Sequence, residues 1–325
     1  MAEWLYEEGI GENRAILVED DDIIAAAIEL PGEMRSGSVL AGRLVQIAIP
    51  GRRAIVATDQ GEVMVEPLPA ALTEGQKVRV EIVREAIAEP GHPKFAKGRI
   101  TDADEKQGPS LAERIGSPPP LRPLGPDLFH EAGWSELIDE ALGTPIDFPG
   151  GELRISLTPA MTLFDVDGVL PPAELAAAGA EAAGRAIRRL GLSGSIGIDL
   201  PTMADRAERQ RAAAALDAVL PQPFERTAVN GFGFLQIVRR RERPSLPETV
   251  QSDPAGAAAR ALLRKAERTP GAGERVLSAA PAVIERIRAN PAWLKELERR
   301  TGTPAVLREE KGLAISAGHV QSRHA

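Results

Sequence analysis

The chain has 325 residues, enough for two or three modest domains, and 43% of them are apolar, so sizeable hydrophobic cores can form. The formal net charge of -8 excludes a uniformly basic nucleic-acid-binding surface, although local clusters of Lys and Arg can still bind phosphates. The absence of cysteine excludes disulfides and thiolate metal sites, and no apolar run approaches the roughly 20 residues that cross a bilayer. We therefore expect a soluble, cytoplasmic protein that does not enter membranes.

The first hundred residues predict short β-strands. Residues 15–30 cluster apolar side chains around an acidic turn at 19–22, a pattern typical of a hairpin. Further β-type runs are separated by turn dipeptides such as Pro50-Gly51, and they occupy residues 39–49, 53–58, 63–65 and 77–84. About five short strands at this spacing predict a small barrel. Residues 101–126 are rich in Pro, Gly, Ser and charge, which predicts a linker.

From residue 131 onward, strands alternate with helices. Helices are predicted at 134–142, 172–190 and 204–220, and strands at 152–158, 161–167, 195–200, 224–230 and 232–239. Gly191 is the expected C-terminal cap of the second helix. This alternation predicts a mixed sheet domain of about 100 residues. Farther along, we expect a helix and linker at 254–279, a helical region at 281–300 broken by Pro291, and a strand in the last dozen residues.

Acidic residues stand at the ends of two apolar strands in this second domain. Asp165 and Asp167 end the strand at 161–167, and Asp199 ends the strand at 195–200. Strand ends line the ligand crevice of such sheets, so the carboxylates can meet there. A hard cation such as Mg²⁺ would relieve their repulsion and could stabilise phosphoryl charge and activate water. The alternative is that these aspartates cap the helices that follow them.

A basic cluster follows the last predicted strand of the same domain. It consists of Arg239, Arg240, Arg241 and Arg243. Guanidinium groups bind phosphates through paired hydrogen bonds, so the cluster is a candidate phosphate-binding element. The alternative is a solvated run of charge. The histidines are scattered and do not show the spacing of a zinc site.

The acids lie within segments that resemble the ribonuclease E/G family. Residues 153–167 read L-R-I-S-L-T-P-A-M-T-L-F-D-V-D and are similar to the stretch that leads to the family's first metal-binding aspartate. Residues 193–200 read S-G-S-I-G-I-D-L and are similar to the segment that holds the second. Residues 232–246 read F-G-F-L-Q-I-V-R-R-R-E-R-P-S-L and resemble the family's F-G-L-L-E-M-T-R-K-R-x-x-P-S-L. The order and approximate spacing of the blocks agree with the family.

The N-terminal part extends this resemblance. Residues 72–82, L-T-E-G-Q-K-V-R-V-E-I, resemble the family's L-x-E-G-Q-E-V-x-V-Q-I, within the region where it inserts an OB-fold RNA-binding barrel. The resemblance therefore implies an α+β fold with the following parts: an incomplete ribonuclease-H-like part at 1–36, an OB-fold-like barrel at 37–100, a linker at 101–130, a mixed α/β, DNase I-like catalytic domain at 131–250, and a helical C-terminal segment at 251–325.

Several family features are missing from this chain. Ile55, Val63 and Met64 stand where family members carry aromatic residues that stack on bases, so RNA binding should be weaker and strongly salt-dependent. The segment that senses a 5′-monophosphate is reduced to residues 101–127, and the zinc-linking cysteines are absent. We therefore expect no preference for the 5′ end and no zinc. A homodimer would have to use apolar surface, such as that around Trp293 and Leu294.

The resemblance implies a Mg²⁺-dependent endoribonuclease that cleaves single-stranded RNA in RNA processing or decay. Asp165 and Asp199 would hold the Mg²⁺, and Asp167 would lie near the scissile phosphate. RNA contacts are expected from the arginine cluster and from the barrel residues Lys94, Lys97 and Arg99. The main alternative is a catalytically weak RNA-binding protein derived from the same family. A third hypothesis is a scaffold that contacts proteins through its Ala-rich C-terminal helices.

Overall fold

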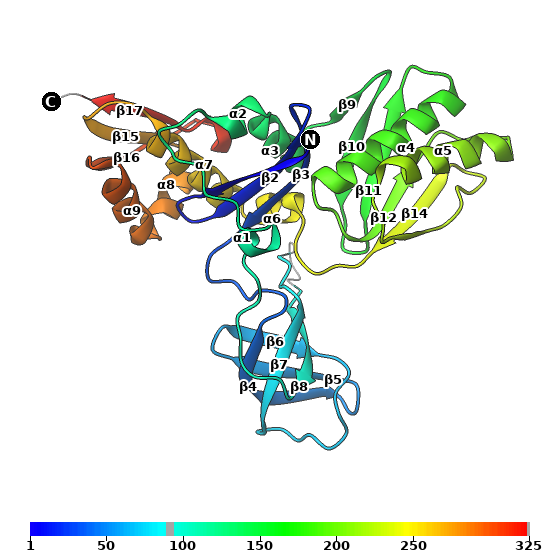
Figure 1. Ribbon diagram of the computed structural model, residues 1–325, viewed down its shortest axis with the longest axis horizontal. Helices are drawn as coiled ribbons and strands as arrows, with labels where there is room; N and C mark the ends of the chain where they lie inside the picture. Colours follow the sequence, from blue (N-terminus) through cyan, green and yellow to red (C-terminus); the bar gives the residue numbers. More distant parts are fainter. Residues whose placement is uncertain (89–93, 324–325) are drawn as a thin grey trace.

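The computed structural model describes residues 1–88 and 94–323, and Figure 1 shows three lobes arranged around a small central sheet. The barrel projects on one side, the sheet domain with its long helices lies on a second, and the C-terminal lobe lies on a third. The chain is a mixed α+β protein with a closed five-stranded barrel and several sheets. Among the described residues, helices long and apolar enough to cross a membrane are absent.

The central sheet is antiparallel, with the order β1-β2-β3: β1 (Glu3–Glu8), β2 (Asn13–Glu19) and β3 (Asp22–Glu29). The predicted hairpin corresponds to β2 and β3. Its turn places Asp20 and Asp21 at φ of 50° and 69°, a left-handed conformation that Asp tolerates better than most residues. The first strand, β1, was not predicted from the sequence.

The barrel closes with the order β4-β5-β6-β8-β7. Its strands are β4 (Val39–Ile49), β5 (Arg53–Thr58), β6 (Gly61–Val65), β7 (Lys77–Arg84) and β8 (Ala96–Thr101). Apolar side chains such as Leu44, Val56 and Val80 fill the interior with no exposure to solvent. The sequence analysis missed β8. Gly98 interrupts its apolar pattern, but a Cβ there would lie 2.3 Å from Val80, so the crowded interior requires glycine. Residues 89–93, which the predicted barrel included, lie outside the described residues.

The segment 101–130, predicted to be a linker or long loop, is mostly irregular backbone with two short helices. The segment holds α1 (Leu111–Arg114) and α2 (Leu128–Glu131), and Ser110 and Glu113 form a capping box on the first. It also packs against the central sheet. The backbone NH of Leu111 donates to Glu29 over 2.7 Å, and that of Leu121 donates to the Tyr6 carbonyl over 2.8 Å. The Pro and Gly content reflected irregular backbone, not a lack of contacts.

The second lobe is a six-stranded sheet with the order β13-β14-β12-β11-β10-β9. Its helices are α3 (Trp134–Leu142), α4 (Pro172–Arg189) and α5 (Arg206–Val219), and its strands are β9 (Ile146–Phe148), β10 (Gly151–Leu157), β11 (Thr162–Gly168), β12 (Gly194–Asp199), β13 (Glu225–Arg226) and β14 (Phe234–Arg239). The predicted alternation of strands and helices is confirmed here. Pro172 opens α4, and Gly191 follows its end at φ 64°, as the sequence indicated.

Helices α4 and α5 cover one face of this sheet (Figure 1). The alternate residues Phe164, Val166, Ile196 and Ile198 are buried on that face. Gly179 lets α4 approach β11 closely, since a Cβ there would lie 2.4 Å from Val166. Because side chains alternate across a strand, the intervening positions point to the other face, which carries the predicted acids.

The segment 251–325 contains the predicted helices and the strand expected in the last dozen residues, but it is not wholly helical. Besides α7 (Pro254–Arg268), α8 (Pro281–Arg288), α9 (Pro291–Thr301) and a 3₁₀ turn, η1 (Ile315–Ala317), this lobe contains β15 (Glu274–Ala279), β16 (Ala305–Glu309) and β17 (His319–Arg323). The helix α6 (Leu246–Ser252) precedes it and packs into the core of the sheet lobe through Leu246 and Val250. The strands β15 to β17 form a sheet with the order β16-β15-β17 over a separate core that includes Leu263, Leu277 and Ile284. Short apolar runs such as β15 do not distinguish strand from helix by periodicity. The predicted break at Pro291 is confirmed.

A buried ionic cluster joins the central sheet to the C-terminal lobe. Arg14 of β2, 1% exposed, pairs with Glu12 over 3.0 Å, and Glu12 also accepts from Arg260 of α7 over 2.7 Å. Arg264 binds both Glu7, over 2.8 Å, and Asp127. Burial lowers the pKa of Arg14, although both glutamates oppose that shift. Arg260 and Arg264 of α7 thus pair with anions of the central sheet and of the segment that follows the barrel, whereas Arg14 pairs with anions of its own part of the chain.

An exposed ion pair on α9 provides a pH-dependent contrast. Hydrogen bonds from Arg299 and then Arg300 lower the pKa of Glu296 from 4.5 to about 2. Since the folded pKa lies below the unfolded one, the contribution of Glu296 is present above about pH 4.5 and is lost as pH falls toward 2. We expect Glu296→Gln to lower the free energy of unfolding by less than about 1 kcal/mol at pH 7 and by nothing near pH 2. Urea titrations at both pH values measure this, and an equal effect at both would contradict it.

Candidate active site

Asp165 and Asp199 lie directly opposite each other on neighbouring strands. Strands β11 and β12 run parallel, and their register pairs Phe164 with Ile198 and Asp165 with Asp199. Paired residues on adjacent strands point to the same face, and adjacent strands are about 4.8 Å apart. Both aspartates are exposed, as is Asp167 two residues farther along the same face. The structure therefore brings together all of the acids that the sequence singled out.

None of these acids caps a helix. The residue that precedes α4 is Pro171, which makes no side-chain capping bond, and α5 is capped by Asp205, whose side chain accepts from the backbone NH of Ala207. The structural alternative considered for Asp165, Asp167 and Asp199 is therefore wrong. Like charges directly opposite each other destabilise a sheet, so the fold alone gives no reason for this pair.

A cation completes the row of side chains across the sheet, and the sequence analysis missed it. Arg154 of β10 is paired in register with Asp165, and Phe234 of β14 is paired with Asp199. The row is thus Arg154, Asp165, Asp199, Phe234. The side chain of Arg154 is 60% exposed and bonds Glu152 over 2.6 Å. Glu152 first, and then Asp167 and Asp165, raise the pKa of Arg154. The alternation of side chains along β10 predicts which face Arg154 occupies, but only the strand pairing shows that its neighbour is Asp165.

An apolar floor lies beside the acids. A Cβ at Gly197 would lie 2.6 Å from the ring of Phe234 and 2.8 Å from Leu163, so the ring covers this glycine. Gly197 precedes Asp199 by two residues on β12, which places the ring on the acidic face. The half-buried Phe234 and Leu163 therefore form a surface next to the carboxylates on which an apolar or aromatic group can rest.

The donor set fits a magnesium ion better than a fully protein-bound metal. In residues 1–88 and 94–323, groups of three or more His, Cys, Asp or Glu arranged to hold a metal are absent. Mg²⁺ keeps several waters and binds through one or two carboxylates, often together with substrate phosphates. Two exposed carboxylates on adjacent strands satisfy that requirement. A structural zinc site, which needs four protein ligands, does not fit them.

The arginine cluster begins at the end of the strands opposite to the acids. β14 is antiparallel to β12, so Arg239 pairs with Gly194, at the start of the strand that ends at Asp199. The length of β12 separates the two ends by about 16 Å, at about 3.3 Å per residue. The structure therefore does not bring the cluster to the acids. Its expected contact with RNA stays a prediction.

Each arginine of the cluster has a partner within the protein. Arg239 donates to the carbonyl of Leu192 over 2.9 Å, and burial lowers its pKa. Arg240 pairs with Glu242 over 3.1 Å, and Arg241 pairs with Glu248. Arg243 pairs with Glu85 of the barrel over 3.3 Å, while the backbone NH of Glu85 donates to the Glu242 carbonyl. Of these contacts, the Arg243–Glu85 pair joins the barrel to the sheet lobe, so the alternative of a wholly solvated run of charge is wrong. Phosphate binding by the cluster stays a prediction.

The predicted basic residues of the barrel also contact protein groups. Lys97 and Arg99 lie on β8 and pair with Glu66 over 3.3 Å and with Glu81 over 2.8 Å. Lys94 donates to the carbonyl of Pro159 over 3.4 Å, in the turn between β10 and β11. The Lys94 contact joins the barrel to the sheet lobe, whereas the pairs made by Lys97 and Arg99 lie within the barrel. An RNA phosphate would have to compete with the carboxylates for Lys97 and Arg99.

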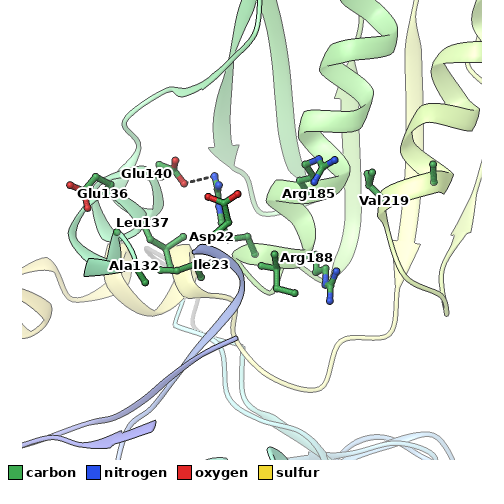
Figure 2. A pocket seen from close by; sticks show the side chains of 13 residues that line it. Asp22, Ile23, Ala132, Glu136, Leu137, Glu140, Arg185, Arg188 and Val219 are labelled. Atoms are coloured by element: carbon green, nitrogen blue, oxygen red, sulfur yellow. Dashed lines mark hydrogen bonds and ion pairs between the residues drawn. The ribbon is translucent and has the colours of Figure 1, made fainter. Parts of the chain in front are cut away.

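A cavity among the described residues lies away from the acids. It has a volume of about 500 Å³ and lies between β3, α3 and the ends of α4 and α5, on the helix-covered side of the sheet. Figure 2 shows Arg185 and Arg188 on its wall, and the ion pair between Arg189 and Glu140, whose atoms are 2.6 Å apart. Burial raises the pKa of Glu140. The cavity contains none of the predicted site residues.

Comparisons with known proteins give no name to this arrangement. The chain matches neither a protein-family model nor a curated protein.

Proposed function

We propose that this protein is a Mg²⁺-dependent endoribonuclease of the ribonuclease E/G type, acting on single-stranded RNA in RNA processing or decay. The observation that carries the proposal is the in-register pairing of Asp165 with Asp199 on the exposed face of the sheet. The two carboxylates repel each other and neither caps a helix, so the pair does not stabilise the fold. A cation-binding role explains its presence. The resemblance of the segments around both aspartates to the family supports the same assignment.

In this proposal Asp165 and Asp199 would hold the Mg²⁺, which supplies charge stabilisation to a phosphate and lowers the pKa of a water. The other residues of the row have separate tasks. Asp167, two residues after Asp165 on β11, would accept a hydrogen bond from the attacking water. The guanidinium of Arg154 would donate to a phosphate oxygen after its hydrogen bond to Glu152 is broken. Hydrolysis then forms a bond from water oxygen to phosphorus and breaks the bond to one ribose oxygen.

The barrel supports RNA as the substrate class. Its five strands close in the order β4-β5-β6-β8-β7, with β6 and β8 parallel and the other neighbours antiparallel. We propose that it is an OB-fold barrel, and in that fold the face of the second and third strands binds oligonucleotides. Here that face belongs to β5 and β6. Ile55 and Met64 on these strands are only half-buried, and they offer apolar contact without aromatic stacking.

The alternative is an RNA-binding protein with little catalysis. The observation that favours it is the small ligand set, since the acids of the site contribute only two facing carboxylates and a neighbour. A cleavage assay decides between the endoribonuclease and the RNA-binding protein. Purified protein is incubated with labelled single-stranded RNA, with Mg²⁺ or with a chelator. We expect cleavage only with Mg²⁺, at equal rates on 5′-hydroxyl and 5′-monophosphate RNA. Binding without cleavage would establish the alternative.

A further inference from the structure

The side chain of Phe232 is unusually exposed. It exposes 83% of its surface, compared with 47% for Phe95. Burying an aromatic ring stabilises a fold strongly, and only 3% of the residues of this chain are aromatic. The ring is attached in the loop that enters β14. The ring makes no contribution to the core, so its position calls for another explanation.

The loop that carries Phe232 is rigidly built. The side-chain oxygen of Asn230 accepts hydrogen bonds from the backbone NH of Phe232, over 2.9 Å, and from that of Phe234, over 3.0 Å. Gly233 has a φ of 94°, and a Cβ there would lie 2.1 Å from the Leu200 carbonyl oxygen. The backbone therefore holds Phe232 at the surface in one conformation. A rigidly presented aromatic ring binds a partner at a low cost in conformational entropy.

The same loop adjoins the acids. Phe234 is paired in register with Asp199, and the backbone NH of Leu200 donates to the Gly233 carbonyl over 3.3 Å. The hydroxyl of Thr202 donates to the Phe232 carbonyl over 3.4 Å. Phe232 is therefore attached at the carboxyl edge of the sheet, where β12 ends at Asp199. A nucleotide whose phosphate lies at the acids has its base within reach of this edge.

We propose that Phe232 is a positioning residue that stacks on one nucleobase of the single-stranded RNA beside the cleaved phosphate; this inference rests on the proposed function. Stacking accepts every base because each has a π-face, so it selects for an unpaired base and not for a sequence. In a duplex both faces of each base are already covered. Phe232 would thus supply, next to the cleaved bond, the stacking that the barrel lacks at Ile55 and Met64.

The test measures dissociation constants of a labelled single-stranded RNA by fluorescence anisotropy, with Ca²⁺ in place of Mg²⁺ so that binding is read without turnover. We expect Phe232→Ala to weaken binding by about 5- to 150-fold, and Phe232→Trp to restore it. The matched control is Val238→Ala, because Val238 is an apolar residue, 49% exposed, on the same β14. It should bind as the unaltered protein does.

A substrate with a single abasic site separates stacking from a structural effect. When the missing base is the stacked one, the unaltered protein should bind as weakly as Phe232→Ala, and that variant should lose nothing more. Equal losses in both proteins would overturn the inference, as would an unchanged affinity of Phe232→Ala for intact RNA. If cleavage with Mg²⁺ then still depends on Asp165, the proposed function stands without it. If the unaltered protein neither binds nor cleaves RNA, the proposed function and the inference both fail.

Discussion

Replacing either Asp165 or Asp199 by Asn should lower the rate of Mg²⁺-dependent RNA cleavage by at least about a hundredfold. Each substitution removes one of the facing carboxylates that the proposal assigns to Mg²⁺. An amide keeps the shape of the side chain but is a much weaker ligand for a hard cation. Initial rates on labelled single-stranded RNA measure the effect. The matched control is Asp139→Asn, because Asp139 is an exposed aspartate of α3, away from the acidic face.

Stability measurements give this prediction a second readout. Since the two carboxylates face each other, either substitution should leave the chain as stable as before, or slightly more stable, when Mg²⁺ is absent. Mg²⁺ should raise the Tm of the unaltered protein, because it binds the folded chain, and should not raise that of either variant. Unchanged cleavage in both variants would remove Asp165 and Asp199 from the catalytic assignment. If one of the two variants does not fold, the Mg²⁺ dependence of Tm and of cleavage in the other variant tests the assignment.

The largest effect on stability should come from Glu12, at the centre of the buried ionic cluster. Glu12 pairs with Arg14 over 3.0 Å and with Arg260 over 2.7 Å, and all three side chains are at most 6% exposed. Glu12→Gln leaves two buried guanidinium groups sharing the remaining anions. Loss of one partner of a buried ion pair costs about 3–5 kcal/mol, because the uncompensated charge stays out of water.

Urea unfolding at neutral pH measures this loss as a change in the free energy of unfolding. The matched comparison is Glu296→Gln, because Glu296 also bonds two arginines but lies at the surface. A loss below about 1 kcal/mol for Glu12→Gln would show that water or rearrangement compensates Arg14 and Arg260. Since Arg260 belongs to the C-terminal lobe and Glu12 to the central part, a separate early transition would show that the lobe unfolds first.

Local patterns along the chain were enough to predict much of the barrel and of the sheet lobe. β4, β5 and β7 have the predicted bounds, and the Pro and Gly residues around α4 mark its ends. These elements depend on side-chain periodicity and on the backbone preferences of Pro and Gly, which act over a few residues. The sequence also located both acids at strand ends, because a buried strand that stops at a carboxylate is a local signal.

Only the tertiary structure decided which side chains meet. Strand pairing joins residues far apart in the chain, so the register that sets Asp165 between Arg154 and Asp199 has no local signal. The antiparallel direction of β14 likewise carried Arg239 to the far edge, although the sequence places it only a few residues after Phe234. Glu12 and Arg260, 248 residues apart, pair in the interior for the same reason. Residue type and periodicity determined the elements and the candidate acids, whereas contacts between distant segments determined the neighbours that give those acids their chemistry.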